Sequence, residues 1–264
     1  MYTLIDGDVI VYSCGFSSQK NEYTCDGVEV FQYKKDATAY ALANNISVSN
    51  ITKTIDASPV SHALQNVKQS LFSIAEACDS NDGKIYLTGK GNYRHDVATS
   101  HVYKGNRDPE HKPVHYDAII DYLIKHWDAE IVEGMEADDA MGIAQYSQGL
   151  EKLGDKRSII CTIDKDLDMI PGWHYNFRRG VKYFTTLKES NFFFYKQMLT
   201  GDRVDNIIGI KGIGEKTAHK LLVNKSPEQM ESIILKKYRS EFKNEAWDRY
   251  NENKKLLWIL REPI

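Results

Sequence analysis

Short runs of apolar and β-branched residues recur along the chain, and most of them close on a glycine or an acidic residue. These runs are YTLIDGD (2–8), KIYLTG (84–89), AEIVEG (129–134), RSIICTID (157–164) and WHYNF (173–177). Longer segments with helix-like spacing separate them, at about 60–78, 114–127 and 136–153. Apolar strands that alternate with helices indicate βαβ units. The pattern therefore predicts an α/β fold, with a mostly parallel, twisted central sheet covered by helices.

Residues 17–58 are more polar, and their pattern is less clear. Within them, VEVFQY (28–33) predicts an edge strand and KKDATAYALANNI (34–46) predicts a helix. The segment DASP (56–59) predicts the turn that closes this part of the chain.

The sequence pattern changes near residue 190. From there, three segments indicate short helices joined by glycine-rich or capped turns: NFFFYKQML (191–199), GEKTAHKLLVN (214–224) and SPEQMESIILKKY (226–238). Ser226, followed by Pro227 and Glu228, is a good N-cap and first turn. We therefore predict an α/β domain over 1–189 and a helical subdomain over 190–264.

Composition limits the classes of protein that the chain can belong to. Its 264 residues are 42% hydrophobic and 27% charged, which suits one sizeable globular domain or one domain with a smaller appendage. No apolar run approaches the roughly 18 residues of a membrane span, and the start MYTLIDGDVIVY indicates a buried strand, without the basic leader of a signal peptide. The four cysteines form no CxxC pair, so we expect reduced thiols in a cytoplasmic protein.

The net charge of −3 would argue against a nucleic-acid partner if the acidic residues were evenly spread. Nine of the 37 acidic residues stand out by their positions: Asp6, Asp8, Glu136, Asp138, Asp139, Asp164, Asp166, Asp202 and Asp205. Setting them aside leaves 28 acidic residues against 34 basic ones. An acidic pocket in a mildly basic body suits a protein that binds a phosphate backbone.

Several of these acids follow predicted strands. Asp6 and Asp8 end the first, residues 136–139 follow the third, and Asp164 and Asp166 end the fourth. In an open parallel sheet, ligands bind outside the carboxyl ends of the strands, so we expect these acids to converge on one edge. Residues 136–139 taken alone have a second interpretation as ordinary helix caps, and 162–168 taken alone as a solvated turn.

Carboxylates packed at one edge repel one another unless cations neutralise them. Oxygen ligands without histidine or cysteine favour Mg²⁺ or Mn²⁺ over zinc. Two such ions roughly 4 Å apart form the site that hydrolyses phosphodiesters. The acids therefore predict metal-dependent phosphate chemistry.

The segment GIKGIGEKTA (209–218) has the form of a hairpin between helices. Its glycines allow a close backbone approach, and the N–H groups of the next helix, with the lysines, supply donors and charge for a phosphate. Nothing in it reads a base edge, so the predicted DNA contact is independent of sequence. The candidate residues are Gly209, Lys211, Gly212, Gly214, Lys216 and Thr217.

Together, these motifs resemble the flap endonuclease/5′→3′ exonuclease family, and most of all the short bacteriophage 5′ nucleases without a polymerase domain. The matching motifs are LIDGD (4–8), YKGNR (103–107), EADDAMG (136–142), TIDKDLD (162–168) and GDRVDNIIGIKGIGEKTA (201–218). They run in order through nearly the whole chain, although none covers residues 17–60. The resemblance implies a 5′-nuclease (PIN-like) fold whose C-terminal subdomain carries a helix-hairpin-helix motif.

The resemblance also implies roles for the candidate residues. One metal site would use Asp6, Glu136 and Asp138, and the other Asp164, Asp166 and Asp202, with Asp139 and Asp205 in support through water. Lys104 and Arg107 match the basic pair that reaches the scissile phosphate and stabilises developing charge. The turn at 209–214 resembles the part that grips duplex DNA, where backbone carbonyls often hold a monovalent cation such as K⁺.

The chain departs from the family where the second strand ends. Relatives usually have an aspartate of the first metal site there, whereas this chain has Thr88 and Gly89. Two explanations remain open: metal affinity is lower at this site, or Asp8 or Asp96 compensates. Asp8 is otherwise expected just behind the metal ligands.

The segment after YKGNR is short, so the resemblance implies a reduced form of the helical arch that threads 5′ ends in larger relatives. His111 and His115 lie four residues apart, but a zinc site there is disfavoured because Pro113 interrupts the helix that would align them. Tyr103 is either a base-stacking ring or a packed aromatic residue.

The resulting hypothesis is a Mg²⁺-dependent 5′→3′ exonuclease and flap endonuclease in phage DNA replication or recombination, in the host cytoplasm. Its substrates would be duplex, nicked or flapped DNA and RNA primers in RNA–DNA hybrids. One alternative is a catalytically weakened, structure-specific DNA-binding protein of the same fold. Another, an RNA-cleaving toxin-type nuclease, gives no reason for the hairpin at 209–218.

Overall fold

The computed structural model describes the chain except for residues 28, 108–110, 148–156 and 264. The described chain divides into two compact units. The first, called here the sheet unit, consists of Met1–Val9, Ser73–His111 and Trp127–Ile264. The second, the ribbon unit, consists of Ile10–Phe72 and Lys112–His126.

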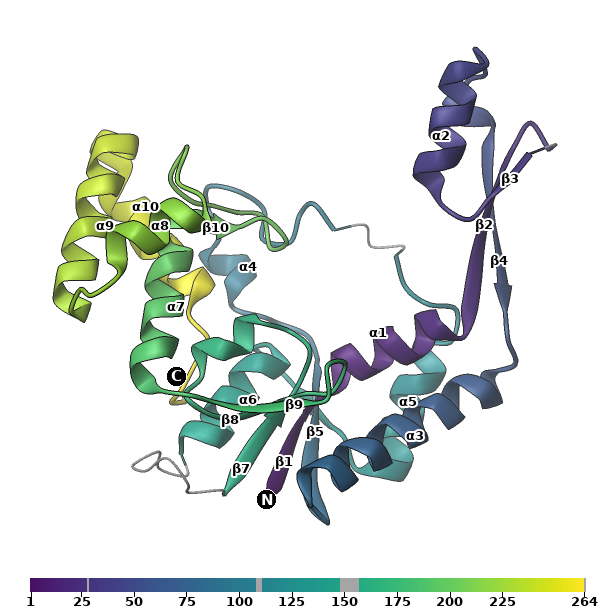
Figure 1. Ribbon diagram of the computed structural model, residues 1–264, viewed down its shortest axis with the longest axis horizontal. Helices are drawn as coiled ribbons and strands as arrows, with labels where there is room; N and C mark the ends of the chain where they lie inside the picture. The colour runs from purple at the N-terminus through teal and green to yellow at the C-terminus, as the bar shows by residue number, and fades with distance from the viewer. Residues whose placement is uncertain (28, 108–110, 148–156, 264) are drawn as a thin grey trace. The chain divides into compact units, whose positions relative to one another are not determined.

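The sheet unit is built on six strands in the order β6-β5-β1-β7-β8-β9 (Figure 1). All neighbours pair in parallel except β9, which runs antiparallel to β8 at one edge. The predicted α/β class with a mostly parallel central sheet is thereby confirmed. The strands are β1 (Tyr2–Asp6), β5 (Asp82–Thr88), β6 (Glu130–Val132), β7 (Ser158–Cys161), β8 (Gly172–Asn176) and β9 (Val181–Thr185).

The interior strands are apolar along their length because they are buried. Leu4 of β1 pairs with Ile160 of β7, and both side chains are fully buried. Helix α6 (Ala137–Tyr146) packs on β1 and β5. It comes so close to the C-terminal segment at Gly142 that a Cβ there would lie 2.3 Å from the carbonyl oxygen of Leu260.

The C-terminal part of the sheet unit is helical. Met198, Ile234 and Tyr238 from this part share one hydrophobic core with Leu4 and Ile160 of the sheet. The predicted boundary at residue 190 therefore lies within a continuous core, and the division there remains a prediction. The elements are α7 (Leu187–Thr200), β10 (Gly201–Asp202), β11 (Ile207–Ile208), α8 (Glu215–Leu222), α9 (Pro227–Phe242), η3 (Lys243–Glu245) and α10 (Ala246–Leu257).

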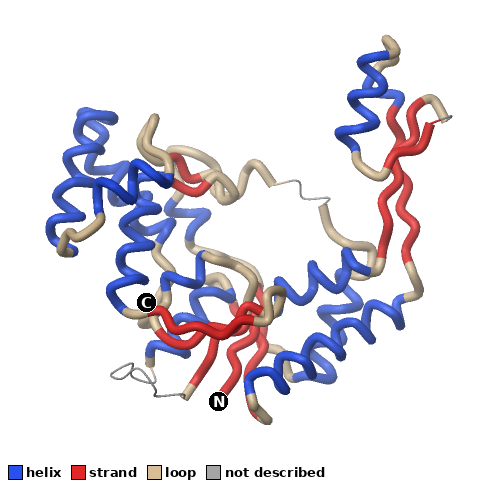
Figure 2. The backbone as a smooth tube through the Cα atoms, viewed as in Figure 1, coloured by secondary structure: helices blue, strands red, loops and turns tan. Residues whose placement is uncertain are grey.

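The ribbon unit contains a three-stranded antiparallel sheet in the order β3-β2-β4, beside which helix α2 lies (Figure 2). Helices α1 and α3 each begin in one unit and end in the other. The elements are α1 (Gly7–Ser17), β2 (Gln19–Cys25), β3 (Glu29–Phe31), α2 (Lys34–Ala43), η1 (Val48–Asn50), β4 (Ile51–Ala57), α3 (Val60–Cys78) and α5 (Tyr116–Trp127).

All five predicted core strands are present, and the helix predicted over 60–78 coincides with α3. The interpretation of residues 1–12 as one strand was wrong beyond Asp6, where β1 ends and α1 begins at Gly7. A Cβ at Gly7 would lie 2.5 Å from the carbonyl oxygen of Tyr86, so only glycine allows α1 to start this close to β5. Of the helix predicted over 136–153, residues 148–153 lie outside the described residues.

Strands β2, β4 and β9 and helix α10 were not predicted. The sequences of β2 and β4 are polar, and Asn253, Lys254 and Lys255 of α10 interrupt its apolar spacing. The sequence VKYFT of β9, in contrast, does have the β-branched and aromatic residues typical of a strand. Among the described residues, no helix is both long enough and apolar enough to cross a membrane.

Candidate active site

The carboxyl ends of the central strands bring Asp6 and Asp164 to one rim of the sheet. Asp6 is the last residue of β1 and is 3% exposed. Its carboxylate accepts hydrogen bonds from the Thr162 hydroxyl (2.7 Å) and the Val9 amide (3.0 Å). The Thr162 hydroxyl also accepts one from the Asp164 amide (3.0 Å), so one side chain after β7 orients both acids.

The start of α6 adds Glu136 and Asp138 to this rim. Glu136 is the N-cap of the helix and is 9% exposed. It accepts hydrogen bonds from the side-chain amide of Asn92 (2.8 Å) and the hydroxyl of Tyr103 (3.2 Å). These donors hold the Glu136 carboxylate toward the rim.

The third group of acids comes from the C-terminal region and from the short helix η2 (Asp166–Met169). The side chain of Gln197, from α7, donates to Asp166 at 2.9 Å. Asp202 and Asp205 lie on the hairpin that follows α7. A single small cavity of about 30 Å³ brings these groups together, and its acidic lining residues are Glu136, Asp138, Asp166, Asp202 and Asp205. Carboxylates from three distant segments therefore meet in this cavity. The strand-end argument predicted this for Glu136, Asp138 and Asp166 but did not cover Asp202 and Asp205.

Burial and mutual repulsion act on the acids of this rim. Burial, and then the charge of Asp8, raise the pKa of Asp6 to about 7. Burial, and then the charges of Asp164 and Asp202, raise the pKa of Asp166 to about 8. The pKa of Asp138 is also well above its usual value, because of burial and the neighbouring Asp6. Negative charge at the rim is thus incompletely compensated by the protein itself.

Lys104 and Arg107 supply positive charge beside the cavity. The Lys104 ammonium donates to Glu136 and lies 3.9 Å from Asp205, and Arg107 forms an ion pair of 2.5 Å with Asp205. The backbone of Lys104 has φ +54°, in the left-handed region, and its amide donates to the carbonyl oxygen of Asp205 (2.9 Å). The two predicted basic residues therefore lie next to the predicted acids Glu136 and Asp205.

The donors at this rim fit a divalent cation in their chemistry. They are carboxylate oxygens, the ligands that Mg²⁺ and Mn²⁺ prefer, and their raised pKa values are what an added cation would relieve. In the described part of the chain, no three acidic, histidine or cysteine side chains are spaced closely enough to hold one ion. The ammonium of Lys104 contacts Glu136 instead, so ligation would require these side chains to move.

Asp8 lies beside Thr88 at the end of β5, where the resemblance leads us to expect an aspartate. It belongs to the first turn of α1, and both carboxylate oxygens accept from the backbone amide of Thr88 at 3.3 Å. The Thr88 hydroxyl accepts from the Ala137 amide at the start of α6 (3.0 Å). Of the two candidates for compensation, Asp8 thus reaches the end of β5, whereas Asp96 is exposed on α4 (Arg94–Val97).

Asp139 has partners other than the ones expected for it. It is fully buried, and its carboxylate forms two hydrogen bonds with the guanidinium of Arg94, at 2.5 and 2.9 Å. The same carboxylate accepts from the amides of Leu260 (2.9 Å) and Glu136 (3.2 Å). With its oxygens engaged by the protein, Asp139 positions Glu136, and we assign it this role in place of metal support.

The predicted DNA-binding glycines fall into two kinds. A Cβ at Gly209 would lie 2.3 Å from the amide nitrogen of Gly201, so Gly209 is required by packing within the protein. A Cβ at Gly212 or Gly214 would meet nothing within 4 Å. Gly214 has an ordinary φ of −93°, so neither strain nor packing explains the absence of a side chain there.

The tip of this hairpin is open and basic. Lys211, Lys216 and Thr217 are exposed, and Gly214 provides no side chain to cap the first N–H groups of α8. These features match a surface that a phosphate approaches closely. Gly212 has φ +77°, a conformation that favours glycine by itself, so the structure favours Gly214 over Gly209 and Gly212 as a contact residue.

Other expectations had different outcomes. Tyr103 is 3% exposed, and its hydroxyl donates to Asp205 (2.8 Å), so the packed alternative is correct and the base-stacking one is wrong. The ring of His115 bonds to the carbonyl oxygen of Ser58 (2.7 Å), which gives no support to a zinc site with His111. Arg94, Asn92 and Gln197 hold the acids in place but carry no motif that would have marked them in the sequence.

Comparison with known proteins supports the expected resemblance. No family model matches the chain. The T5 D15 protein crystallised with metal ions has a TM-score of 0.53 and 13% identity, covering 97% of this chain and 88% of that one. T5 5′-exonuclease with bound zinc has a TM-score of 0.51 and 14% identity, and the match also covers 97% of this chain and 88% of that one. The bacteriophage T5 D15 flap endonuclease in a complex with DNA and metal ions has a TM-score of 0.50 and 13% identity, covering 97% of this chain and 98% of that one.

Two curated proteins match a shorter stretch. DNA polymerase I of Thermus aquaticus is 38% identical over 100 residues, which is 34% of this chain and 12% of that protein. DNA polymerase I of Pseudomonas aeruginosa is 35% identical over 100 residues, 34% of this chain and 11% of that protein. The chain thus matches only about a tenth of these polymerases' length. Together with the T5 structures, they confirm the resemblance to the 5′ nucleases, and the fold is that of the T5 enzyme.

The buried ion pair predicts a large effect on stability. Replacing Arg94 by methionine leaves the Asp139 carboxylate buried without its partner, which should lower the free energy of unfolding by about 3–5 kcal/mol. Urea denaturation measures this loss. The control is Lys125→Ala, which removes a surface pair with Asp121 whose side chains are 66% and 64% exposed. Equal losses in the two variants would contradict the role assigned to Arg94.

Proposed function

We propose that the protein is a divalent-metal-dependent 5′ nuclease of the flap endonuclease/5′→3′ exonuclease family. It hydrolyses phosphodiester bonds near the 5′ ends of duplex, nicked or flapped DNA. The observation that carries this proposal is the cavity where acids from three distant segments meet beside Lys104. The T5-type fold supports it. RNA primers in hybrids as substrates, and a role in phage replication or recombination in the host cytoplasm, are finer parts of the same proposal.

The acids divide into two sets that would hold the cations. Asp6, Asp8, Glu136 and Asp138 belong to the first, and Asp164, Asp166 and Asp202 to the second. When bound, two divalent cations activate the attacking water and stabilise the leaving oxygen. The carboxylates are positioned for this by Thr162, Asn92 and Gln197, whose hydrogen bonds to them are already formed.

Lys104 and Arg107 act on the phosphate. Lys104 is held at the mouth of the cavity by its backbone bond to Asp205, and its side chain is 23% exposed. Its ammonium donates to a non-bridging oxygen of the scissile phosphate, where negative charge develops. Because the donor is in place before reaction, this contact stabilises the transition state without reorganisation.

The hairpin tip binds the same DNA away from the cut. Asp202 and Asp205 precede the tip by only a few residues, and β11 is fixed at its base by Asn253, which donates to the carbonyl oxygen of Ile208 (2.8 Å). The short connection therefore sets the distance between grip and cut. A K⁺ ion held by carbonyls of the turn is part of this proposal.

A second candidate is a catalytically weakened DNA-binding protein. The observation in its favour is Thr88, which stands at the end of β5 where relatives have an aspartate. The Asp8 carboxylate on the Thr88 amide argues against it, because it restores an acid at that position.

The deciding experiment is a divalent-metal titration with a nicked duplex labelled at the 5′ end. We expect short 5′ products with Mg²⁺ or Mn²⁺ and none with EDTA. Asp166→Asn should abolish cleavage and leave duplex binding largely unchanged, as measured by fluorescence anisotropy. Duplex binding by the wild type without any metal-dependent product would favour the second candidate.

The role of Lys104 gives a kinetic prediction. Lys104→Ala should lower kcat by about 10²–10³-fold, as loss of one preorganised donor does, with little change in KM. Lys216→Ala, at the hairpin tip, is the matched control and should raise KM instead. A rise in KM alone for Lys104→Ala would make Lys104 a steering residue and not a catalytic one.

The position of Asp8 predicts a change in metal affinity. Asp8→Asn should raise the Mn²⁺ concentration for half-maximal activity by about 10-fold or more, the range seen when groups around a metal are removed. Isothermal titration calorimetry with Mn²⁺ and no DNA checks the same affinity independently of turnover. Asp96→Asn is the control, and an equal effect there would argue against the assignment of Asp8.

A further inference from the structure

The ribbon unit carries a binding surface that the proposed chemistry does not use. Its strand β2 pairs with β3 and β4 on its two sides, and directly paired residues share one face of an antiparallel sheet. Tyr23 pairs with Phe31 on one side and with Lys53 on the other. Asn21 and Gln19 lie at alternate positions from Tyr23, so they share this face.

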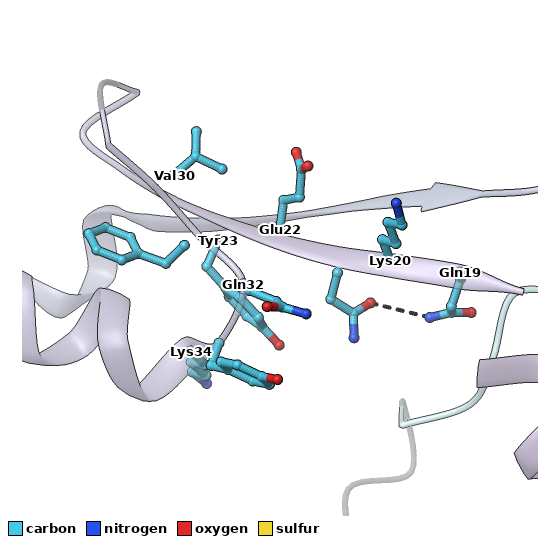
Figure 3. Close-up of a pocket in the computed structure, with 10 residues that line it drawn as sticks. Gln19, Lys20, Glu22, Tyr23, Val30, Gln32 and Lys34 are labelled. Carbon is cyan, nitrogen blue, oxygen red and sulfur yellow. Dashed lines mark hydrogen bonds between the residues drawn. The ribbon is translucent and has the colours of Figure 1, made fainter. Parts of the chain in front are cut away.

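The pairing also separates the charges. The opposite face carries Glu22, together with the pair Lys20 and Asp56. Figure 3 shows the side chains of Glu22 and Lys20 directed away from Tyr23 and Gln32. Among the described strand residues, Glu29 is the acid on the Tyr23 face, and it lies at the far end from Gln19. The face near Gln19 and Tyr23 thus combines aromatic and amide groups with a lysine.

A cavity of about 540 Å³ lies on this face, at the start of α2 (Figure 3). This volume is within the roughly 300–1,000 Å³ of ligand pockets. Besides Gln19, Asn21, Tyr23 and Phe31, the residues that line it are Lys20, Glu22, Val30, Gln32, Tyr33 and Lys34. Phe31, which lines the cavity, packs on Tyr40 of α2 with ring centroids 5.3 Å apart. This contact holds the Phe31 ring in place.

Tyr33 is the group that packing within the protein does not explain. Its side chain is 55% exposed, and the ammonium of Lys35 lies 5.4 Å from the ring centroid. One side-chain amide beside it, that of Asn21, is also available. Gln19 donates to Asn21 (3.2 Å) and accepts from the Val114 amide (2.8 Å), which fixes the Asn21 side chain. In the described residues, the side-chain nitrogen of Asn21 has no partner, so it can bond to a ligand.

We infer that this cavity binds an unpaired nucleotide of single-stranded DNA. An exposed ring offers a stacking surface for a base, side-chain amides bond to base edges, and lysines contact the backbone phosphate. These three kinds of group meet here, and Glu22 is the acid among the residues that line the cavity. The inference deepens the proposed function, because the unpaired 5′ arm of a flap is such a strand.

The test is binding of a fluorescent oligothymidylate to the full-length protein, followed by anisotropy. Tyr33→Ala should weaken binding about tenfold, in the range of one lost stacking contact, whereas Tyr33→Phe, which keeps the ring, should restore it. Lys34→Ala should weaken binding and reduce its salt dependence. Lys125→Ala, a surface lysine on α5 that is not among the residues lining the cavity, should leave binding unchanged. Equal binding by wild type and Tyr33→Ala would overturn the inference, as would equal losses in Lys125→Ala and Lys34→Ala.

A second measurement separates this inference from the proposed function. KM is measured for a flap with an unpaired 5′ arm and for a nick without one. Tyr33→Ala should raise the KM for the flap, divided by the KM for the nick, about tenfold relative to wild type. A wild type that cleaves neither substrate, with oligothymidylate binding still lost in Tyr33→Ala, would refute the nuclease and leave the binding site standing. Cleavage of both with an unchanged ratio would overturn the binding site alone.

Discussion

Repulsion between carboxylates gathered on one rim of the sheet is the constraint on which the rest of the structure depends. Burial and neighbouring charge raise the pKa values of Asp6 and Asp166, so the charge of these acids has to be offset by bound protons or by cations. The chain supplies two kinds of cationic side chain. Arg94 is 2% exposed and permanently bound to the fully buried Asp139, so its charge belongs to the architecture. Lys104 is 23% exposed and pairs with Glu136 at the edge, where a phosphate or a metal ion can take over its contacts.

The buried pair also explains why the helical C-terminal region cannot be a loose appendage. Besides Asp139, the Arg94 guanidinium donates to the carbonyl oxygens of Leu256 (3.0 Å) and Trp258 (2.7 Å). The Leu260 amide in turn donates to Asp139. The last turn of α10 and the segment after it therefore hold the start of α6, and through it Glu136. Stability of the C-terminal region and the geometry of the rim are coupled through one guanidinium.

The sequence was informative where one physical rule acts alone. Buried parallel strands are continuously apolar, and parallel strands end at a common edge, so both the central sheet and the convergence of Asp6, Glu136 and Asp166 could be predicted. Contacts between distant segments leave no such pattern. Nothing in the residues around Arg94 indicates a buried ion pair, and the glycine-rich turn does not reveal that Gly209 packs against Gly201 while Gly214 is open. Strands β2 and β4 are polar and are held together by pairing with each other, which the structure shows but the sequence pattern does not.

The end of β5 shows that position in space decides a residue's role more than position in a motif. Thr88 provides no carboxylate, but its amide and hydroxyl bind Asp8 and the Ala137 amide. One residue thus joins the first turn of α1 to the start of α6. An aspartate at position 88 would place a further negative charge beside Asp8 and Glu136, where burial already raises the pKa of Asp8. An aspartate on β5 would therefore repel Asp8, and the threonine avoids this repulsion while donating its amide to Asp8.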